Sequence, residues 1–220
     1  MSSASEPTSV VSRVPGVTAR RCLWVAFGVV WLGAAGAGLW TLWAYENRPG
    51  VGAKADTRWP DGATLAREPG RATLVMLAHP QCVCTRASVA ELAEVLARAR
   101  TRPKSYVVFL KPSGFAAGWE QTDLWRRAAA LPDATVLRDD EGRLAKTFGA
   151  ETSGQTLLYG ADGTLLFSGG ITGARGHAGR NAGRIALLAL LDPLENEPGV
   201  WTRVFGCSLF SREPDRSSRE

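Results

Sequence analysis

The sequence lacks several patterns that identify common kinds of active or binding site. It contains no serine–histidine–acid set that can be placed as a catalytic triad, no nucleotide-binding loop and no pair of catalytic carboxylates. It also lacks a long basic stripe interleaved with aromatic residues, so we expect no nucleic-acid partner despite a net charge of +5. Cysteine and histidine are scarce, with four and two residues, and each can therefore be considered individually.

Charge is also absent from one long stretch of the chain. No Asp, Glu, Lys or Arg lies between Cys22 and Tyr45, and about 20 apolar residues suffice for a helix to cross a membrane. Arg20 and Arg21 precede this stretch, which predicts a cytoplasmic N-terminus. We expect residues 22–45 to be a single-pass anchor in the cytoplasmic (inner) membrane, with the following domain in the periplasm or outside the cell.

A cleaved signal peptide is the alternative, with cleavage after Ala37. The apolar run continues from Leu39 to Tyr45, which a cleaved signal does not need, so we favour an uncleaved anchor. A lipoprotein is disfavoured because Cys22 follows Arg21 rather than small apolar residues. We expect Cys22 to be a packing residue in the membrane.

The rest of the chain divides by composition. At 45% hydrophobic and 21% charged residues, 220 residues fit one globular domain with appendages. We expect residues 1–21 to be a disordered cytoplasmic segment, residues 46–70 a proline- and glycine-rich linker, residues 71–192 the domain and residues 193–220 a polar tail.

Strand and helix patterns alternate within residues 71–192. They predict strands at 74–78, 105–111 and 134–137, helices at 85–100, 120–131 and 139–148, a hairpin of 155–159 and 164–167, and a final helix from about 181–183 to 191. The hairpin has Asp162 and Gly163 at its turn. This order predicts an α/β fold with a central mixed β-sheet flanked by helices on both faces.

Cys82 and Cys84 directly follow the first predicted strand, where the first helix begins. The unpaired N–H groups at a helix N-terminus favour an anion, so a thiolate there is stabilised, and Arg86 adds positive charge. The alternative is that both cysteines are small buried hydrophobic residues. Their spacing and the expected location outside the cytoplasm favour redox or metal chemistry.

The segment from His79 to Arg86, the glycine-rich stretch from Gly169 to His177 and the order of elements resemble the thioredoxin-like superfamily. Within it they are similar to the membrane-anchored thiol–disulfide and peroxiredoxin-like branch, including a group labelled RedB. The resemblance covers residues 71–192 and implies a thioredoxin-like fold preceded by a single transmembrane helix. The family's second cysteine would fall on Thr85, but this chain has Cys84 instead. The family's cis-proline falls on Gly154.

The resemblance implies a membrane-anchored, extra-cytoplasmic thiol–disulfide oxidoreductase with a Cys-x-Cys site and no cofactor. Its partners would be extra-cytoplasmic protein thiols and disulfides. Cys82 would be the attacking cysteine, and either Cys84 or Cys207 would release the mixed disulfide. Cys207 lies in the predicted tail, where a resolving thiol and a spare thiol are equally good interpretations.

Copper(I) delivery is the second class of function, because soft thiolates select that ion. The candidate ligands are Cys82, Cys84, His79 and His177. Copper-delivery relatives carry a histidine just before the third main strand, where this chain has threonine and serine, which disfavours the metal alternative. A thiol peroxidase is less favoured still, because the Pro-x-x-x-Thr-x-x-Cys signature is missing around Cys82.

Other candidate residues have simpler interpretations. A lone histidine is more often structural than a ligand, so we interpret His79 as an ordinary strand-end residue and His177 as a solvated loop residue. The arginines at 175, 180 and 184 are most simply a solvated basic face, although an anion could bind there. Asn181 is a candidate N-cap for the last helix.

Overall fold

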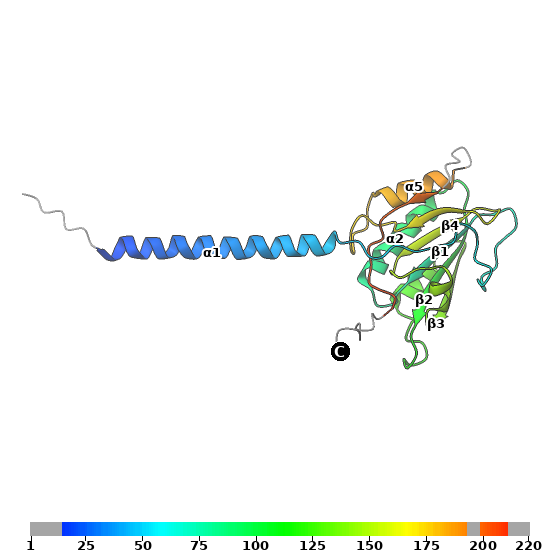
Figure 1. The fold of residues 1–220 in the computed structure, drawn as a ribbon, viewed down its shortest axis with the longest axis horizontal. Helices are drawn as coiled ribbons and strands as arrows, with labels where there is room; N and C mark the ends of the chain where they lie inside the picture. The colour runs from blue at the N-terminus through cyan, green and yellow to red at the C-terminus, as the bar shows by residue number, and fades with distance from the viewer. Residues whose placement is uncertain (1–14, 193–198, 211–220) are drawn as a thin grey trace, which may run out of the picture. The chain divides into compact units, whose positions relative to one another are not determined.

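The computed structural model describes residues 15–192 and 199–210 (Figure 1). The chain forms two compact units that divide between Tyr45 and Glu46, and each is described separately. Residues 1–14, which we expected to be disordered, lie outside the described residues. Residues 15–21, expected in the same disordered segment, instead form the start of the first helix.

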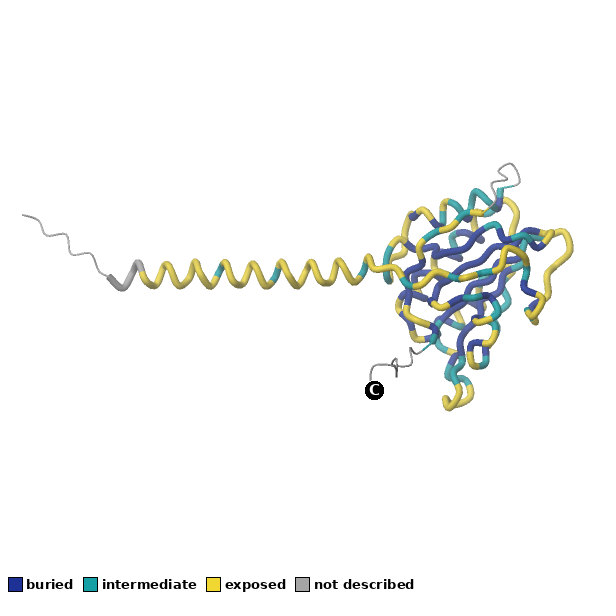
Figure 2. Tube along the Cα trace, viewed as in Figure 1, coloured by how far each residue is buried: buried dark blue, intermediate teal, exposed yellow. Residues whose placement is uncertain are grey.

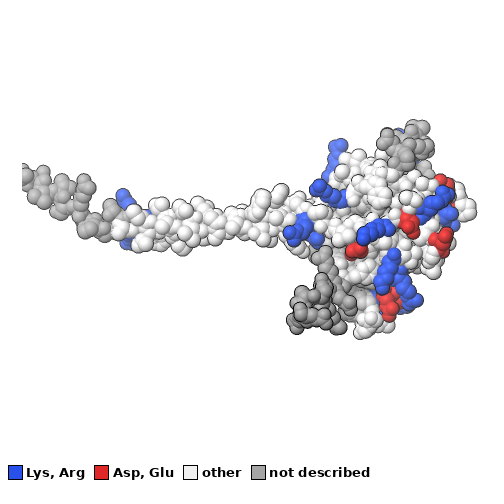
Figure 3. Space-filling view, in the orientation of Figure 1, with Lys and Arg blue, Asp and Glu red and all other residues white. Residues whose placement is uncertain are grey.

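The first unit is the helix α1 (Pro15–Glu46). Its span Ala19–Glu46 has a mean hydropathy of 1.8, and it is long and apolar enough to cross a membrane. At 1.5 Å per residue, 28 residues reach about 42 Å, against a hydrocarbon core of about 30 Å. From Ala19 onward most of its residues are exposed (Figure 2), and most of its visible length is uncharged (Figure 3). Length and composition thus make α1 a candidate transmembrane span.

The second unit is built on a six-stranded mixed sheet in the order β3-β2-β1-β4-β5-β6. Strands β1, β2 and β3 are parallel to one another, β4 is antiparallel to both β1 and β5, and β6 is parallel to β5. The strands are β1 (Thr73–Ala78), β2 (Lys104–Lys111), β3 (Ala134–Asp140), β4 (Gln155–Tyr159), β5 (Leu165–Gly169) and β6 (Val200–Trp201). Every residue of β1 and β4 is buried, as expected for strands covered on both faces.

Two hydrophobic clusters lie on the two faces of this sheet. Alternate residues of β1 point to opposite faces, so Leu74 and Met76 enter one cluster, while Val75 and Leu77 enter the other. Helices α2 (Val83–Arg98), α3 (Asp123–Ala129) and α5 (Ala182–Leu190) contribute side chains to the first cluster. The short helix α4 (Arg143–Thr147) belongs to the second. The predicted α/β fold with a mixed sheet flanked by helices is confirmed.

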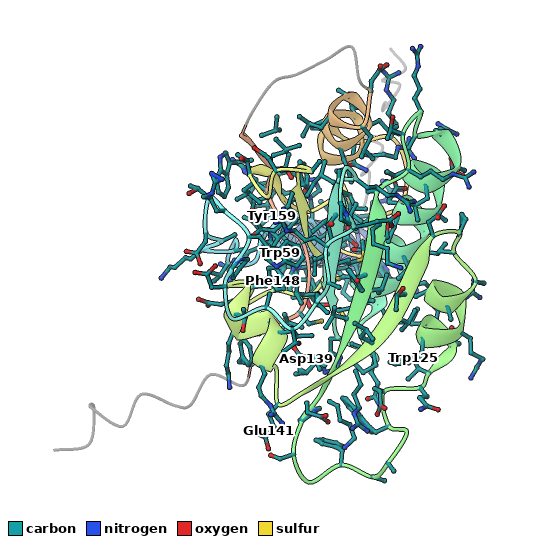
Figure 4. All side chains as sticks on the ribbon, turned by 90° about the vertical axis from the view of Figure 1, so that its right-hand side faces the viewer. Trp59, Trp125, Asp139, Glu141, Phe148 and Tyr159 are labelled. Atoms are coloured by element: carbon teal, nitrogen blue, oxygen red, sulfur yellow. The ribbon has the colours of Figure 1, made fainter. Side chains whose placement is uncertain are left out.

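Residues 46–70 differ from the linker that we expected, because they pack on the second face of the sheet. The Trp59 ring lies 5.3 Å from the Phe148 ring and 5.1 Å from the Tyr159 ring, between centroids (Figure 4). Backbone bonds fix the segment as well, including Lys54 N–H to the Gly149 oxygen at 2.9 Å. A five-residue helix cannot cover this face alone, so irregular chain supplies the remaining cover. Proline and glycine indicated irregular backbone but not its packing.

One predicted boundary is wrong for a physical reason. Asp139 and Asp140 were expected to open a helix, but they end β3, and α4 begins only at Arg143. The buried Asp139 carboxylate nevertheless accepts the N–H groups of Leu144 and Ala145, at 2.8 and 2.9 Å. The acidic residue therefore stabilises the helix start, as the pattern indicated, but does so from the end of a strand.

The hairpin and the last helix follow the predicted pattern closely. The Asp162 carboxylate accepts the Thr164 N–H at 2.9 Å, and Gly163 has a left-handed φ of 84° in the turn. Asn181 is the N-cap of α5, where its side-chain oxygen accepts the Arg184 N–H at 2.9 Å. The N-cap prediction is confirmed.

Residues 199–210 lie within the tail expected at 193–220, but they are part of the folded unit. After β6 the segment, orange to red in Figure 1, continues past the sheet to the residues before β4. Leu209 is buried in the second hydrophobic cluster. Residues 193–198 and 211–220 lie outside the described residues.

Candidate functional site

Cys82 stands between β1 and α2. It is the N-cap residue of α2, with an extended backbone (φ −92°, ψ 124°) and only 3% of its surface exposed. Its sulfur is therefore beside the helix end where backbone N–H groups lack partners within the helix. The structure places this thiol where the sequence pattern indicated.

All three cysteines that we selected outside α1 meet at this point. The Cys207 sulfur lies 2.9 Å from the Cys82 sulfur, although 125 residues separate them in the chain. Cys84, in the first turn of α2, is also buried, and it is close enough to influence the pKa values of the other two thiols. All three are free thiols. Cys82 and Cys84 are buried; Cys207 is exposed overall, but its sulfur points toward the Cys82 sulfur.

Backbone pairing brings Cys207 to this position. The Ser153 N–H donates to the Cys207 carbonyl at 2.8 Å, and the Leu209 N–H donates to the Glu151 carbonyl at 2.8 Å. Thr152 and Ser208 form an antiparallel bridge between these two bonds. The segment around Cys207 thus lies like a short extra strand along the residues that lead into β4.

The contact between the thiols separates their pKa values. Hydrogen bonding with the Cys207 thiol, then with the Cys84 thiol, lowers the pKa of Cys82 far below its ordinary value, and the Thr85 N–H adds to this. The same contact with Cys82 raises the pKa of Cys207. For Cys84, the Cys207 thiol lowers the pKa, but contact with Cys82 and burial outweigh it, and the net shift is upward. The directions of these shifts favour Cys82 as the thiolate of the three.

A buried network of hydroxyl groups links the cysteine turn to the residues before β4, and sequence reasoning missed it. The Ser153 oxygen accepts the His79 N–H at 2.8 Å and lies 2.7 Å from the Thr85 hydroxyl oxygen. The Thr85 hydroxyl donates to the His79 carbonyl at 3.0 Å. Thr85, at the family's second cysteine position, is thus a structural residue here. The only signal of this network in the sequence was that two positions discussed for the family resemblance, Thr85 and Ser153, carry hydroxyl side chains.

The two histidines lie in different surroundings. His79 is partly buried, its ring stands edge-on to Trp119, and burial lowers its pKa. Its Nδ1 accepts the Gln81 N–H at 3.2 Å. His177 is exposed and lies 3.4 Å from the Glu46 carboxylate, between Nε2 and Oε2. Among the described residues, no group of three or more His, Cys, Asp or Glu side chains is arranged to hold a metal ion.

Two of the three arginines that we interpreted as a solvated face have internal partners. Arg184 pairs with the Glu91 carboxylate at 2.9 Å, and Glu91 is only 2% exposed. The Arg175 Nη1 donates to the Gly206 carbonyl at 2.6 Å, next to Cys207. Arg180 is exposed, as expected. Local sequence could not identify these partners because each is more than 30 positions away.

Comparison with known proteins gives structural matches only. No protein-family model and no curated protein matches the chain. An uncharacterised conserved protein from Geobacillus kaustophilus is similar over 77% of this chain and 94% of its own, with a TM-score of 0.55 and 16% identity. A hypothetical protein from Sinorhizobium meliloti is similar over 74% and 93%, with a TM-score of 0.50 and 21% identity. A lipoprotein thioredoxin from Streptococcus pneumoniae matches over 56% and 84%, with a TM-score of 0.40 and 18% identity.

At these identities the likeness concerns the fold. The structure has the mixed sheet, the β4-β5 hairpin and the cysteine at the start of the helix after β1 that the sequence predicted. It adds the strand order, in which the hairpin lies beside β1. The RedB-like branch stays a resemblance of sequence. The chain thus has a thioredoxin-like fold, with one N-terminal apolar helix that is a candidate transmembrane span.

Proposed function

We propose that the chain is a membrane-anchored, extra-cytoplasmic thiol–disulfide oxidoreductase in which Cys82 attacks and Cys207 resolves. The observation that supports this is the 2.9 Å contact between the Cys82 and Cys207 sulfurs at the N-terminus of α2. A thiolate is the nucleophile in disulfide exchange, and the lowered pKa of Cys82, caused by the neighbouring thiols, keeps it in that form.

The exchange takes two steps. The Cys82 thiolate attacks one sulfur of a partner disulfide, forming a mixed disulfide, while the partner's other sulfur leaves as a thiolate and takes up a proton. The Cys207 thiol then loses its proton, and its sulfur attacks Cys82. A Cys82–Cys207 disulfide forms and the partner leaves with a second thiol. The partner gains two electrons and two protons: the two cysteines supply both electrons, Cys207 supplies one proton and water supplies the other. The reverse sequence oxidises partner thiols.

Cys84 is the less suitable resolving residue. A Cys82–Cys84 disulfide would close a ring across a single intervening residue, and such a tight ring is strained. The raised pKa of Cys84, to which contact with Cys82 and burial contribute, also keeps it protonated. We assign it a supporting role, since hydrogen bonding with its thiol contributes to the low pKa of Cys82.

The location follows from α1. Its apolar span is long enough for a membrane, and Arg20 and Arg21 lie at the N-terminal end of that span. Positive charge favours the cytoplasmic side, so the domain would face outward, where protein disulfides persist.

The test is a redox titration of the full-length chain in detergent. The chain is equilibrated with graded mixtures of reduced and oxidised glutathione, free thiols are trapped by alkylation, and disulfides are mapped by mass spectrometry. We expect a Cys82–Cys207 bond that forms and breaks reversibly. Cys207→Ser should accumulate a Cys82–glutathione mixed disulfide, Cys84→Ser should retain the Cys82–Cys207 bond, and Cys22→Ser is the matched control.

Two other results would count against the proposal. A bond mapped between Cys82 and Cys84 would remove the role of Cys207. If both thiols stayed reduced in every mixture and were protected from alkylation only by added copper(I), the oxidoreductase mechanism would fail and metal binding would replace it.

A further inference from the structure

The position of Cys207 depends on a segment with little regular structure. Strand β6 has two residues, and the chain from residue 202 to residue 210 forms no helix or further strand, apart from one isolated bridge at Ser208. The Cys207 sulfur is nevertheless held 2.9 Å from Cys82. The contacts on each side of Cys207 therefore determine whether the two sulfurs can meet.

The contacts on the two sides differ in kind. At Cys207 itself and after it, the backbone bonds with Ser153 and Glu151 hold the chain. Before it, Gly206 packs so tightly that a Cβ would collide with the Ser153 carbonyl, so this position requires glycine. The Gly206 carbonyl accepts a hydrogen bond from the guanidinium of Arg175 at 2.6 Å. Further back, the Gly50 N–H donates to the Val204 carbonyl at 2.8 Å, but directly before Cys207 the hydrogen bond comes from the Arg175 side chain.

Arg175 also contacts the start of the domain. Its Nε donates to the Arg48 carbonyl at 3.1 Å, and its backbone N–H donates to the Glu46 carbonyl at 3.0 Å. A guanidinium carries several donors in one rigid plane, so it can join two carbonyl groups with fixed geometry. Arg175 thus connects residues 46–48, the loop after β5 and the residue before Cys207.

The loop that carries Arg175 is fastened to the helix that carries Cys82. The buried Glu91 carboxylate on α2 accepts the Gly179 N–H and pairs with Arg184 at 2.9 Å. The Asn181 side-chain amide donates to the Ile171 carbonyl at 2.8 Å. The loop of Arg175 is therefore held against α2. Through its bond to Gly206, Arg175 fixes the Cys207 segment relative to Cys82.

We infer that Arg175 is a positioning residue that holds the resolving thiol Cys207 against Cys82. This inference rests on the proposed function, because it matters only if Cys207 closes a disulfide with Cys82. Arg175 acts through the Gly206 carbonyl. Without it, Cys207 samples a larger volume and its effective concentration at the Cys82 sulfur falls.

The experiment measures how readily Cys207 displaces glutathione from Cys82. The full-length chain is equilibrated with glutathione buffers, and the ratio of the Cys82–Cys207 disulfide to the Cys82–glutathione disulfide is measured by mass spectrometry. We expect Arg175→Met to lower this ratio about tenfold, the effect of losing the charge-assisted hydrogen bond to the Gly206 carbonyl. Arg175→Lys, which keeps the charge but has a single donor nitrogen, should give an intermediate ratio. Arg180→Met, in the same loop and exposed, should leave the ratio unchanged.

The same substitution in a chain that also carries Cys207→Ser separates the positioning of Cys207 from a general effect on Cys82. With Cys207→Ser in place, Arg175→Met should leave the amount of Cys82–glutathione disulfide unchanged. An equal change there would overturn the inference, because Arg175 would then act on Cys82 itself. A ratio in Arg175→Met equal to that of Arg180→Met would overturn it too. If Arg175→Met does not fold, the same comparison is decided with Arg175→Lys. A wild-type chain that never forms the Cys82–Cys207 bond overturns the proposed function, and this inference with it.

Discussion

At the residue scale, the acidity of Cys82 depends on a side chain that lies 125 residues later in the sequence. Hydrogen bonding with Cys207 is the largest cause of the lowered pKa of Cys82, and the Cys84 thiol is the next. The helix N-terminus, which the sequence did indicate, supplies a smaller contribution through the Thr85 N–H. Local sequence therefore singled out Cys82 but not the contact with Cys207 that is the main cause of its lowered pKa.

This dependence gives a prediction about pH. Because the folded-state pKa of Cys82 is lowered by Cys207, wild-type Cys82 should be alkylated rapidly at pH values well below the ordinary thiol pKa of 9.0. Cys207→Ala removes the largest cause, so the pH profile of alkylation should move upward, toward the ordinary value. The measurement is the rate at which iodoacetamide modifies Cys82 in the reduced chain, followed by mass spectrometry. It covers roughly pH 4 to 10, a range that brackets thiol titration.

Cys84→Ala provides the comparison for this experiment, because the Cys84 contact ranks second and should shift the profile less. Identical profiles for wild type and Cys207→Ala would contradict the assigned cause.

The lowered pKa of Cys82 also affects the stability of the fold. It adds stability that is fully present above the pKa of Cys82 in the unfolded state and is lost as pH falls through its pKa in the folded state.

At the scale of elements, the junction between α2 and the start of α5 depends on one buried ion pair. Arg184 lies 2.9 Å from Glu91, and their side chains are only 11% and 2% exposed. Glu91 also accepts the Gly179 N–H and a hydrogen bond from Asn181. The pair therefore holds the loop of Arg175 against the cysteine helix.

Removing one partner should leave a buried carboxylate without its counter-charge. We expect Arg184→Met to destabilise the reduced domain by about 3–5 kcal/mol, the usual cost of breaking a buried pair from one side. Urea unfolding of the full-length chain in detergent, followed by tryptophan fluorescence, measures this free energy. Arg180→Met serves as the exposed control, and equal unfolding midpoints for the two variants would show that the pair does not have this role.

Elements with a strong local pattern were predicted best. The short apolar run of β1, the spacing of Leu92 and Leu96 in α2 and the Asp-Gly turn all identify their elements without tertiary information. The Asp139 boundary was wrong because acidic residues favour a helix start whether they lie inside the helix or just before it. Trp59 could not be placed from its neighbours, because its contacts are with Phe148 and Tyr159.

At the scale of the whole molecule, the proposed location rests on α1, the candidate membrane span. We expect the full-length chain to remain in bacterial membranes after alkaline extraction, because its apolar span suits a membrane helix. We also expect a cysteine introduced at Ser113, an exposed residue, to react with a membrane-impermeant maleimide on intact spheroplasts. Both measurements use a chain whose four native cysteines are replaced by serine.

The control for this topology is a cysteine introduced at Ser9, which should react only after lysis. Replacing Arg20 and Arg21 by glutamate should weaken the preference for this orientation. Release of the chain by alkaline extraction would contradict anchoring, and labelling of position 9 but not 113 on intact spheroplasts would contradict the proposed orientation.

The sequence by itself determined the features that arise from nearby residues: an uncharged stretch of membrane length, the alternating strands and helices of an α/β domain, and a thiol at a helix start. Tertiary structure alone decided that Cys207 meets Cys82, that Arg175 holds the residue before it, and that residues 46–70 cover one face of the sheet. The physical reason is that helix and strand patterns depend on neighbours a few positions away, whereas these contacts are backbone and side-chain bonds between segments that only the folded sheet brings together.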